Sequence, residues 1–492
     1  MGDLRFTVPP TLDFDPRVWE TAYISGIEGI PWHCHHTFDG QQFSIGREID
    51  ESGKLNIVWP TKSFGNLCLS TTSLRLSEQP YDLAVEIARG TVSRLRNQTA
   101  EWQRVGLRLP DRFFPLAEDA LSQFLRSVTS GREPAKQWDY AQQAIDLSVD
   151  ACVLLCNTFA AQSLEARRQG EGRLSTLLGI ELASQLPSRT VAETKYKAFN
   201  LVCVPVDFGR VETASGKIDY TAFDSQVEWA VQTEKKICIG PLVNFRPGGL
   251  PQWMVMLDEG FENILSGACE FARATVERYR GQVHIWNAAA GLNIPSELNW
   301  SDEEVLRMAV SLIETIRRAD DRCPVLLTID QPWSEYLRND PNGISPLHFA
   351  DALIRADLGL SGLALDLNMD TWPAGSFPRD PVEVNRLIDR WSMLGLPLMV
   401  TLSSPTEDSA PPAGNSAKAP QQVSHWKTSA QSSGILAPDS LVRLLLSKPS
   451  VHALIWIDGA HPQRPARSLW DAGGQSKPLL NSMAALRKVL LH

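Results

Sequence analysis

The stretch Val283-His284-Ile285-Trp286-Asn287-Ala288-Ala289-Ala290-Gly291-Leu292-Asn293 decides the fold of the chain. It begins as a short apolar run and then reaches the amide side chain of Asn287. A run of this length and composition is typical of a strand that is buried on both faces in a parallel sheet. The stretch therefore predicts a buried strand that delivers a polar side chain to the edge of a sheet.

Seven further apolar runs show the same pattern. With the first, the predicted strands span 178–182, 201–206, 236–243, 283–286, 324–329, 362–365, 398–401 and 453–457. Helical periodicity is found between them, for instance over 303–319, 382–394 and 439–446. Eight strand–helix units are the number that closes a parallel barrel, so the sequence predicts an α/β fold of the (β/α)8 TIM barrel type.

Polar residues stand at nearly every predicted strand end. They are Asp207, Asn244, Asn287, Asp330, Asp366, Asn368, Thr401 and Asp458. A single aspartate at such a place is more often a helix cap or a loop anchor. In barrels of this type, however, the C-terminal strand ends and the loops after them form the active face. The set as a whole therefore predicts a functional mouth.

The N-terminal part of the chain has a different pattern. Residues 1–76 contain short β-rich runs that are interrupted by Gly and Asp, which predicts a small sandwich-like module. Residues 77–170 change to helical periodicity, with runs from about 81 to 102, 116 to 128 and 138 to 168. We therefore expect three parts: a β-rich module over 1–76, a helical segment over 77–170, and the barrel over 171–492.

Composition excludes several classes of partner. The 492 residues are 43% hydrophobic and 21% charged, with a formal net charge of −10. Nucleic-acid binding relies on clustered Lys and Arg, so we expect no nucleic-acid partner. We find no apolar run near the roughly 20 residues of a membrane helix and no basic-then-apolar leader, so we expect no membrane association.

Most of the eight cysteines lie inside apolar runs, as small buried thiols do. An even cysteine count in so long a chain is weak evidence for disulfides, which favours a reducing compartment and a cytoplasmic location. His33 and His35 alternate along one predicted strand, but no other ligand set accompanies them. We therefore predict neither a metal site nor a cofactor.

Several motifs resemble glycoside hydrolase family 10, the xylanase family, in their order and spacing. They are Phe199-Asn200, Ile218-Asp219-Tyr220, Gly240-Pro241-Leu242-Val243, Leu250-Pro251-Gln252-Trp253, Ile285-Trp286-Asn287, Leu396-Pro397-Leu398-Met399-Val400-Thr401, Lys448-Pro449-Ser450-Val451 and Lys477-Pro478. The resemblance covers roughly the last three-fifths of the chain. It implies a barrel whose mouth acts on or binds a polysaccharide or an oligosaccharide.

The departures from the family concern its catalytic residues. The resemblance places the acid/base glutamate at Ala288 and the nucleophile at Leu402. It also places a sugar-binding Glu-Asn pair near Asp207 and a histidine at Pro241. A retaining glycosidase needs two carboxyl groups, one protonated and one ionised, and hydrocarbon side chains can take neither role.

Three hypotheses follow for the function. In the first, the mouth binds a glycan with lost or altered hydrolysis, as in a pseudoenzyme; candidate contacts are Asp207, Asn244, Trp253, Trp286, Asn287, Asn368, Trp372, Trp456 and Asp458. In the second, hydrolysis of O-glycosyl bonds uses relocated carboxylates such as Asp330 and Asp366, which end neighbouring strands. In the third, the helical segment is an assembly surface, with the oligomeric state left open.

The segment 403–434 is rich in Ser, Pro, Ala and Gln and follows the seventh predicted strand. Because it has little to bury, we expect a flexible loop beside the mouth. A tolerated insertion and a lid are both compatible with this composition.

Overall fold

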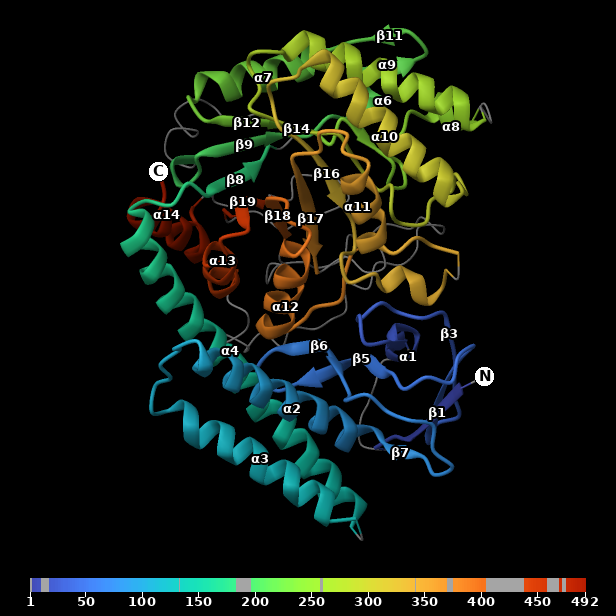
Figure 1. The fold of residues 1–492 in the computed structure, drawn as a ribbon, viewed down its shortest axis with the longest axis vertical. Helices are drawn as coiled ribbons and strands as arrows, with labels where there is room; N and C mark the ends of the chain where they lie inside the picture. The colour runs from blue at the N-terminus through green and yellow to red at the C-terminus, as the bar shows by residue number, and fades with distance from the viewer. Residues whose placement is uncertain are drawn as a thin grey trace.

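A closed barrel of eight parallel strands forms the C-terminal part of the chain in this computed structural model (Figure 1). The structure describes residues 2–9, 17–131, 133–182, 196–256, 260–340, 342–369, 375–403, 438–457, 469–470 and 475–492. The strands are β8 (Leu177–Glu181), β9 (Leu201–Val204), β12 (Lys236–Ile239), β14 (Ile285–Asn287), β16 (Val325–Ile329), β17 (Gly362–Asn368), β18 (Leu398–Ser403) and β19 (Val451–Trp456). Each pairs with the next in sequence order, and β19 closes the barrel on β8. The predicted (β/α)8 barrel is confirmed.

Helices surround the barrel, and two short pairs of strands extend it. The longer helices are α7 (Thr221–Gln232), α9 (Phe261–Tyr279), α10 (Asp302–Ala319), α11 (Pro346–Arg355), α12 (Pro381–Ser392), α13 (Pro438–Leu446) and α14 (Pro478–Leu490). The short elements are α6 (Phe208–Val211), α8 (Gln252–Met256), η1 (Tyr196–Ala198), η2 (Glu335–Arg338), β10 (Glu212–Ala214) with β11 (Lys217–Ile218), and β13 (Val243–Asn244) with β15 (Ala289–Ala290).

Local signals explain where the helices begin. Helix α10 starts with a capping box, in which the Ser301 and Glu304 side chains each bond the other residue's backbone N–H. Helix α12 is capped at its N-terminus by Asp380, whose carboxylate accepts hydrogen bonds from Val382 N and Glu383 N.

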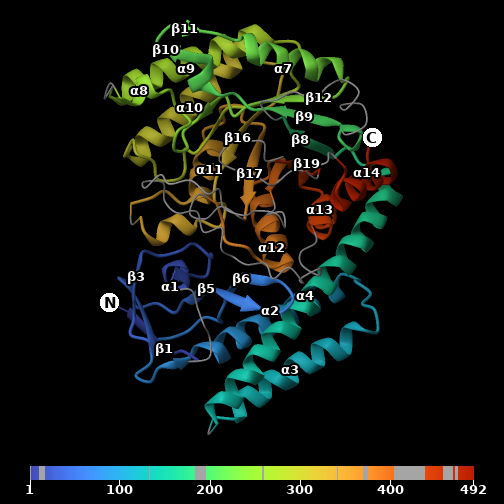
Figure 2. The same cartoon turned by 180° about the vertical axis from the view of Figure 1, so that it is seen from behind.

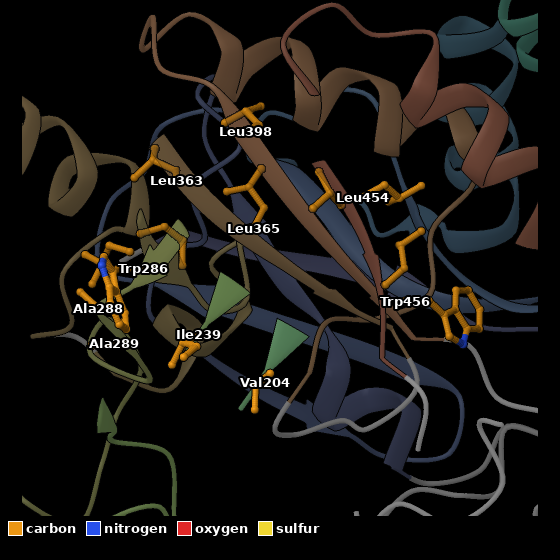
Figure 3. Packing of buried hydrophobic residues seen from close by; sticks show 14 of the residues in the cluster. Val204, Ile239, Trp286, Ala288, Ala289, Leu363, Leu365, Leu398, Leu454 and Trp456 are labelled. Carbon is orange, nitrogen blue, oxygen red and sulfur yellow. The ribbon is translucent and has the colours of Figure 1, made fainter. Parts of the chain in front are cut away.

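The strand side chains alternate between two buried layers. One set points outward and joins the helices in the large hydrophobic cluster, part of which Figure 3 shows around Ile239, Leu365 and Leu454. The other set fills the inside of the barrel; it comprises Leu201, Cys203, Cys238, Leu326, Ala364, Met399, Ala453 and Ile455. This alternation of period two decides which residues reach the mouth.

Two sheets of mainly antiparallel strands lie in the N-terminal part, with strand orders β3-β4-β1-β7 and β2-β5-β6. The strands are β1 (Gly2–Thr7), β2 (Tyr23–Ser25), β3 (Cys34–Phe38), β4 (Gln42–Arg47), β5 (Lys54–Thr61), β6 (Gly65–Ser70) and β7 (Tyr81–Asp82); α1 (Arg17–Thr21) is a short helix between β1 and β2. Strand β1 alternates buried and exposed residues along its length. Its buried residues Leu4 and Phe6 share a core with the helices that follow. The sheets fit the expected β-rich module.

Three helices follow: α2 (Leu83–Arg104), α3 (Phe113–Thr129) and α4 (Pro134–Glu171). Gly90 lets α2 approach β6, because a Cβ there would lie 1.9 Å from the Ser70 carbonyl oxygen. Helix α4 meets the length and hydropathy requirement for a membrane span, contrary to the reading of the sequence, but half of its most apolar window is buried within the protein. A single helix of this kind is weak evidence for a membrane span, since core helices of soluble proteins share these features.

The N-terminal part and the barrel lie side by side in Figures 1 and 2. Two buried ion-pair clusters lie where they meet. In the first, Arg94 of α2 lies 2.6 Å from Asp380 and 3.3 Å from Glu383. In the second, Arg379 lies 2.8 Å from Glu335 and donates a hydrogen bond to the Tyr23 hydroxyl. Buried charges need partners, so these contacts fix how the two parts meet.

We predict that Arg94→Ala lowers the free energy of unfolding by about 3–5 kcal/mol, because it leaves the buried Asp380 carboxylate without its cation. Urea denaturation measures the change. Arg104→Ala, at an exposed position of the same helix, is the matched control and should shift stability by less than about 0.5 kcal/mol. Equal effects of the two substitutions would contradict the role of the buried pair.

Candidate functional site at the mouth of the barrel

A layer of polar side chains covers the apolar interior at the C-terminal ends of the strands. Its inward-facing members come from β14, β16, β17 and β18 and include Asn287, Thr328, Asp330, Asp366, Asn368, Thr401 and Ser403. The C-terminal face is the place where barrels of this type bind their ligands. The structure therefore brings together a large share of the residues that the sequence placed at strand ends.

Arg246 links the two aspartates of this layer. Its Nε donates to Asp330 Oδ1 at 2.5 Å, and its Nη2 donates to Asp366 Oδ2 at 2.8 Å. Both carboxylates are nearly inaccessible, with side-chain exposures of 1% and 6%, whereas Arg246 is 24% exposed. The guanidinium thus bridges the two carboxylates and lies nearer to the solvent than either of them.

The loop after β12 and the loop after β14 hold this bridge in position. Asn244, at the end of β13, accepts a hydrogen bond from Arg246 N through its side-chain oxygen at 3.2 Å. Gly291 has φ +82°, and a Cβ there would lie 2.5 Å from Arg246 N, so only glycine permits this approach. Gly291 N also donates to Asp330 Oδ2 at 2.7 Å.

All four carboxylate oxygens of the two aspartates accept a hydrogen bond. Asp330 receives Arg246 and Gly291, while Asp366 receives Arg246 and the Thr401 hydroxyl at 3.1 Å. Burial raises the pKa of Asp330 above its ordinary value, and the charge of Arg246 opposes that rise. Burial also lowers the pKa of Arg246, but the two carboxylates outweigh it and raise the pKa above its usual range.

The neighbouring amides are also satisfied within the protein. The Asn287 amide donates to the Thr328 hydroxyl at 2.8 Å, and the Asn368 side-chain oxygen accepts from the Ser403 hydroxyl at 3.0 Å. Both asparagines are buried. The polar layer is therefore internally bonded, and Asn244, Arg246 and Thr401 are its partly exposed members.

Among the other proposed ligand contacts, Asp207 and Trp253 bond to residues outside this layer. Asp207 is exposed, caps α6 and forms an ion pair with Arg210 at 3.0 Å. Trp253 lies on α8, where its Nε1 donates to the Glu212 carbonyl oxygen at 3.0 Å. Trp372 and Asp458, like most of the segment 403–434, lie outside the described residues.

Two predicted sugar-stacking rings are buried in the structure. Trp286 precedes the inward-facing Asn287, so it points outward into the helix layer and donates from Nε1 to Asp320 at 3.0 Å. Trp456 belongs to the same buried cluster, with 3% of its surface exposed (Figure 3). The alternation along each strand corrects the expectation for both, because neither ring has a free face for a sugar.

Ala288 and Leu402, which the resemblance aligns with the two catalytic glutamates, both lie in the large hydrophobic cluster. Their exposed fractions are 0% and 2%. Neither side chain carries an ionisable group, so no proton transfer or glycosyl-ester formation can occur at these positions.

Sequence reasoning missed Arg246. It stands in a Gly- and Pro-rich loop, and its partner Asp330 lies 84 residues further along the chain. A single arginine in a loop is most simply a solvated side chain. The only available signal was the presence of several carboxylates at strand ends, which need a cation if they are buried together.

The chain was compared with protein families, curated proteins and solved structures. No family model and no curated protein matches the sequence. Among solved structures, xylanase 10B of Thermotoga maritima has 13% identity and a TM-score of 0.47, over 67% of this chain and 98% of that one. This chain resembles the family 10 xylanases.

Two further structures show the same degree of likeness. A family 10 enzyme from Paenibacillus barcinonensis has 13% identity over 68% of this chain and 98% of its own, with a TM-score of 0.47. Xylanase B of Clostridium stercorarium F9 has 14% identity over 65% and 98%, again with a TM-score of 0.47. The barrel itself is established by its own strand pairing.

We predict that Arg246→Met destabilises the protein by about 3–5 kcal/mol at neutral pH, because two buried carboxylates lose their cation. Without Arg246, the pKa of Asp330 rises further in the folded state. A carboxyl group whose pKa is higher in the folded state than in the unfolded state stabilises the folded protein when the pH is below both values. This stabilisation is lost as the pH rises through the pKa of the folded state. The destabilisation relative to wild type should therefore be smaller at low pH.

Urea denaturation of wild type and Arg246→Met near pH 5 and near pH 8 measures both effects. Arg210→Met, which removes an exposed arginine paired with an exposed aspartate, is the control and should change little at either pH. A difference between wild type and Arg246→Met that does not depend on pH would contradict the bridge.

Proposed function

We propose that the mouth of this barrel binds a hydroxyl-rich ligand of the oligosaccharide class and does not cleave it by a paired-carboxylate mechanism. One observation carries the proposal: Arg246 bridges Asp330 and Asp366, the two carboxylates that the sequence offered for relocated catalysis. The likeness to xylanases suggests which ligand class to examine.

Glycoside hydrolysis requires two carboxyl groups with different tasks. One donates a proton to the leaving oxygen, and the other is a nucleophile or activates water; the two stand about 5–5.5 Å apart in retaining enzymes and about 6.5–9.5 Å apart in inverting ones. In this barrel a single guanidinium engages both acids, and every oxygen already accepts a donor. A buried acid in this state has no path for delivering a proton to a sugar.

The same bridge is suited to binding. Arg246 is held in place by two carboxylates and remains partly exposed. Its other N–H groups can therefore donate to a ligand with little further loss of side-chain conformational entropy. Asn244 and Thr401 lie beside it and supply an amide and a hydroxyl. A few convergent polar groups of this kind give a pocket its orientation and specificity.

Hydrolysis by Asp330 and Asp366 is the second candidate, and one observation favours it. Burial raises the pKa of Asp330, which is a property of general acids. This mechanism would require Arg246 to move away from both acids when the substrate binds.

Isothermal titration with xylobiose, longer xylo-oligosaccharides and cello-oligosaccharides tests the proposal, together with an assay for released reducing sugar. We expect binding without release. Arg246→Lys keeps the positive charge but lacks the planar guanidinium, which can donate two parallel hydrogen bonds. It should weaken binding by about tenfold or more, because a bidentate hydrogen bond is lost. Glu277→Ala, which alters an exposed residue near the end of α9 that leads into β14, is the control at the opposite end of the barrel and should bind as wild type does.

Absence of binding to every sugar in a protein that remains folded would contradict the ligand class. Release of sugar that disappears in both Asp330→Asn and Asp366→Asn would contradict the non-hydrolytic part and support the second candidate.

A further inference from the structure

An open groove lies between α2 and α3, away from the barrel mouth. Its volume is about 610 Å³, and buried Val92, Leu95, Phe113 and Phe124 form its floor. Helices α2 and α3 both pack on α4, and α3 is the outermost of the three in both views (Figures 1 and 2). The groove offers a position for a further helix beside this pair.

A row of exposed apolar side chains stands next to the groove on α3. Phe114, Leu125 and Val128 have 44%, 54% and 44% of their surface exposed. Their spacing of 11 and 3 residues places them on one side of the helix, beside Leu121, which lines the groove. We call these three residues the α3 ridge.

We propose that this surface joins two copies of the chain across a two-fold axis, with the α3 ridge of each copy seated in the α2–α3 groove of the other. In such a contact both copies use the same patch, so the patch must be complementary to itself. A convex apolar ridge next to a concave apolar groove meets that requirement. In this contact, α2 and α3 of one copy and α2 and α3 of the other form a four-helix arrangement.

The charges along the surface support a second copy as the occupant. Arg96 lines the groove on α2 and is exposed. Glu118 is exposed on α3 one turn from Phe114, so it lies along the ridge. When the ridge of one copy enters the groove of the other, Glu118 approaches Arg96, and the two-fold axis repeats the pair.

The surface is also large enough for a weak dimer interface. About 16 residues of each helix span roughly 24 Å, and two helices that are each roughly 10 Å wide lie side by side, so the face measures about 500 Å² in projection. Two such faces bury about 1,000 Å² in total, which is in the range of weak interfaces, below about 1,200 Å². The α2–α3 face thus approaches the area of a small dimer interface.

Sedimentation equilibrium of the full chain over loading concentrations of about 1–100 µM tests the proposal. We expect wild type to be a dimer that dissociates on dilution. Leu125→Asp should abolish the dimer, because it places a charge on the ridge; the side chain is exposed, so the variant should still fold. Val489→Asp alters a comparably exposed apolar residue of α14, with 61% exposure, and should leave the dimer unchanged.

A charge reversal makes the test specific to the two-fold contact. Arg96→Glu and Glu118→Arg should each weaken dimerisation by about tenfold through like-charge approach, and the double variant should recover it. Wild type that remains a monomer throughout the range would overturn the proposal and leave the groove to another protein. A dimer that is indifferent to Leu125→Asp, or that the double variant fails to restore, would overturn it as well.

Discussion

The mouth of this barrel is organised by one arginine held between two buried aspartates. Placing Asp330 and Asp366 side by side in a buried layer would be costly without a cation, since like charges repel and burial penalises each of them. Arg246 removes that difficulty through two short hydrogen bonds. In our proposal, the same hydrogen bonds keep both acids from transferring protons, so the contact that stabilises the mouth also limits its chemistry.

The contacts that support this bridge come from separate parts of the chain. Arg246 follows the third barrel strand, Gly291 follows the fourth, and the two acids end the fifth and sixth. The parallel sheet of the barrel brings these positions together, because β12, β14, β16 and β17 are neighbours and their C-terminal ends share one rim. Farther away, the Arg94–Asp380 ion pair and the Arg379–Tyr23 hydrogen bond attach the N-terminal sheets and helices to the same scaffold. Charged groups thus fix both the mouth and the junction.

The sequence was sufficient for the barrel and for part of its mouth. Apolar runs separated by helical periodicity predicted all eight strands, and the polar residues that followed them predicted which side chains would gather on the rim. Side-chain direction was harder to predict. Trp286 and Trp456 belong to the correct strands, but neighbouring residues on a strand point to opposite faces, and an error of one position moves a ring from the mouth to the helix layer. Arg246 was beyond prediction, because its function depends on contacts with residues 84 and 120 positions away.

A crystal structure of the chain soaked with xylobiose is the most direct test of this account. The account predicts that Arg246 still bridges Asp330 and Asp366, with the sugar lying above the guanidinium and its glycosidic bond intact. A complex in which Arg246 has turned away, and the two carboxylates face the glycosidic oxygen from opposite sides, would contradict it.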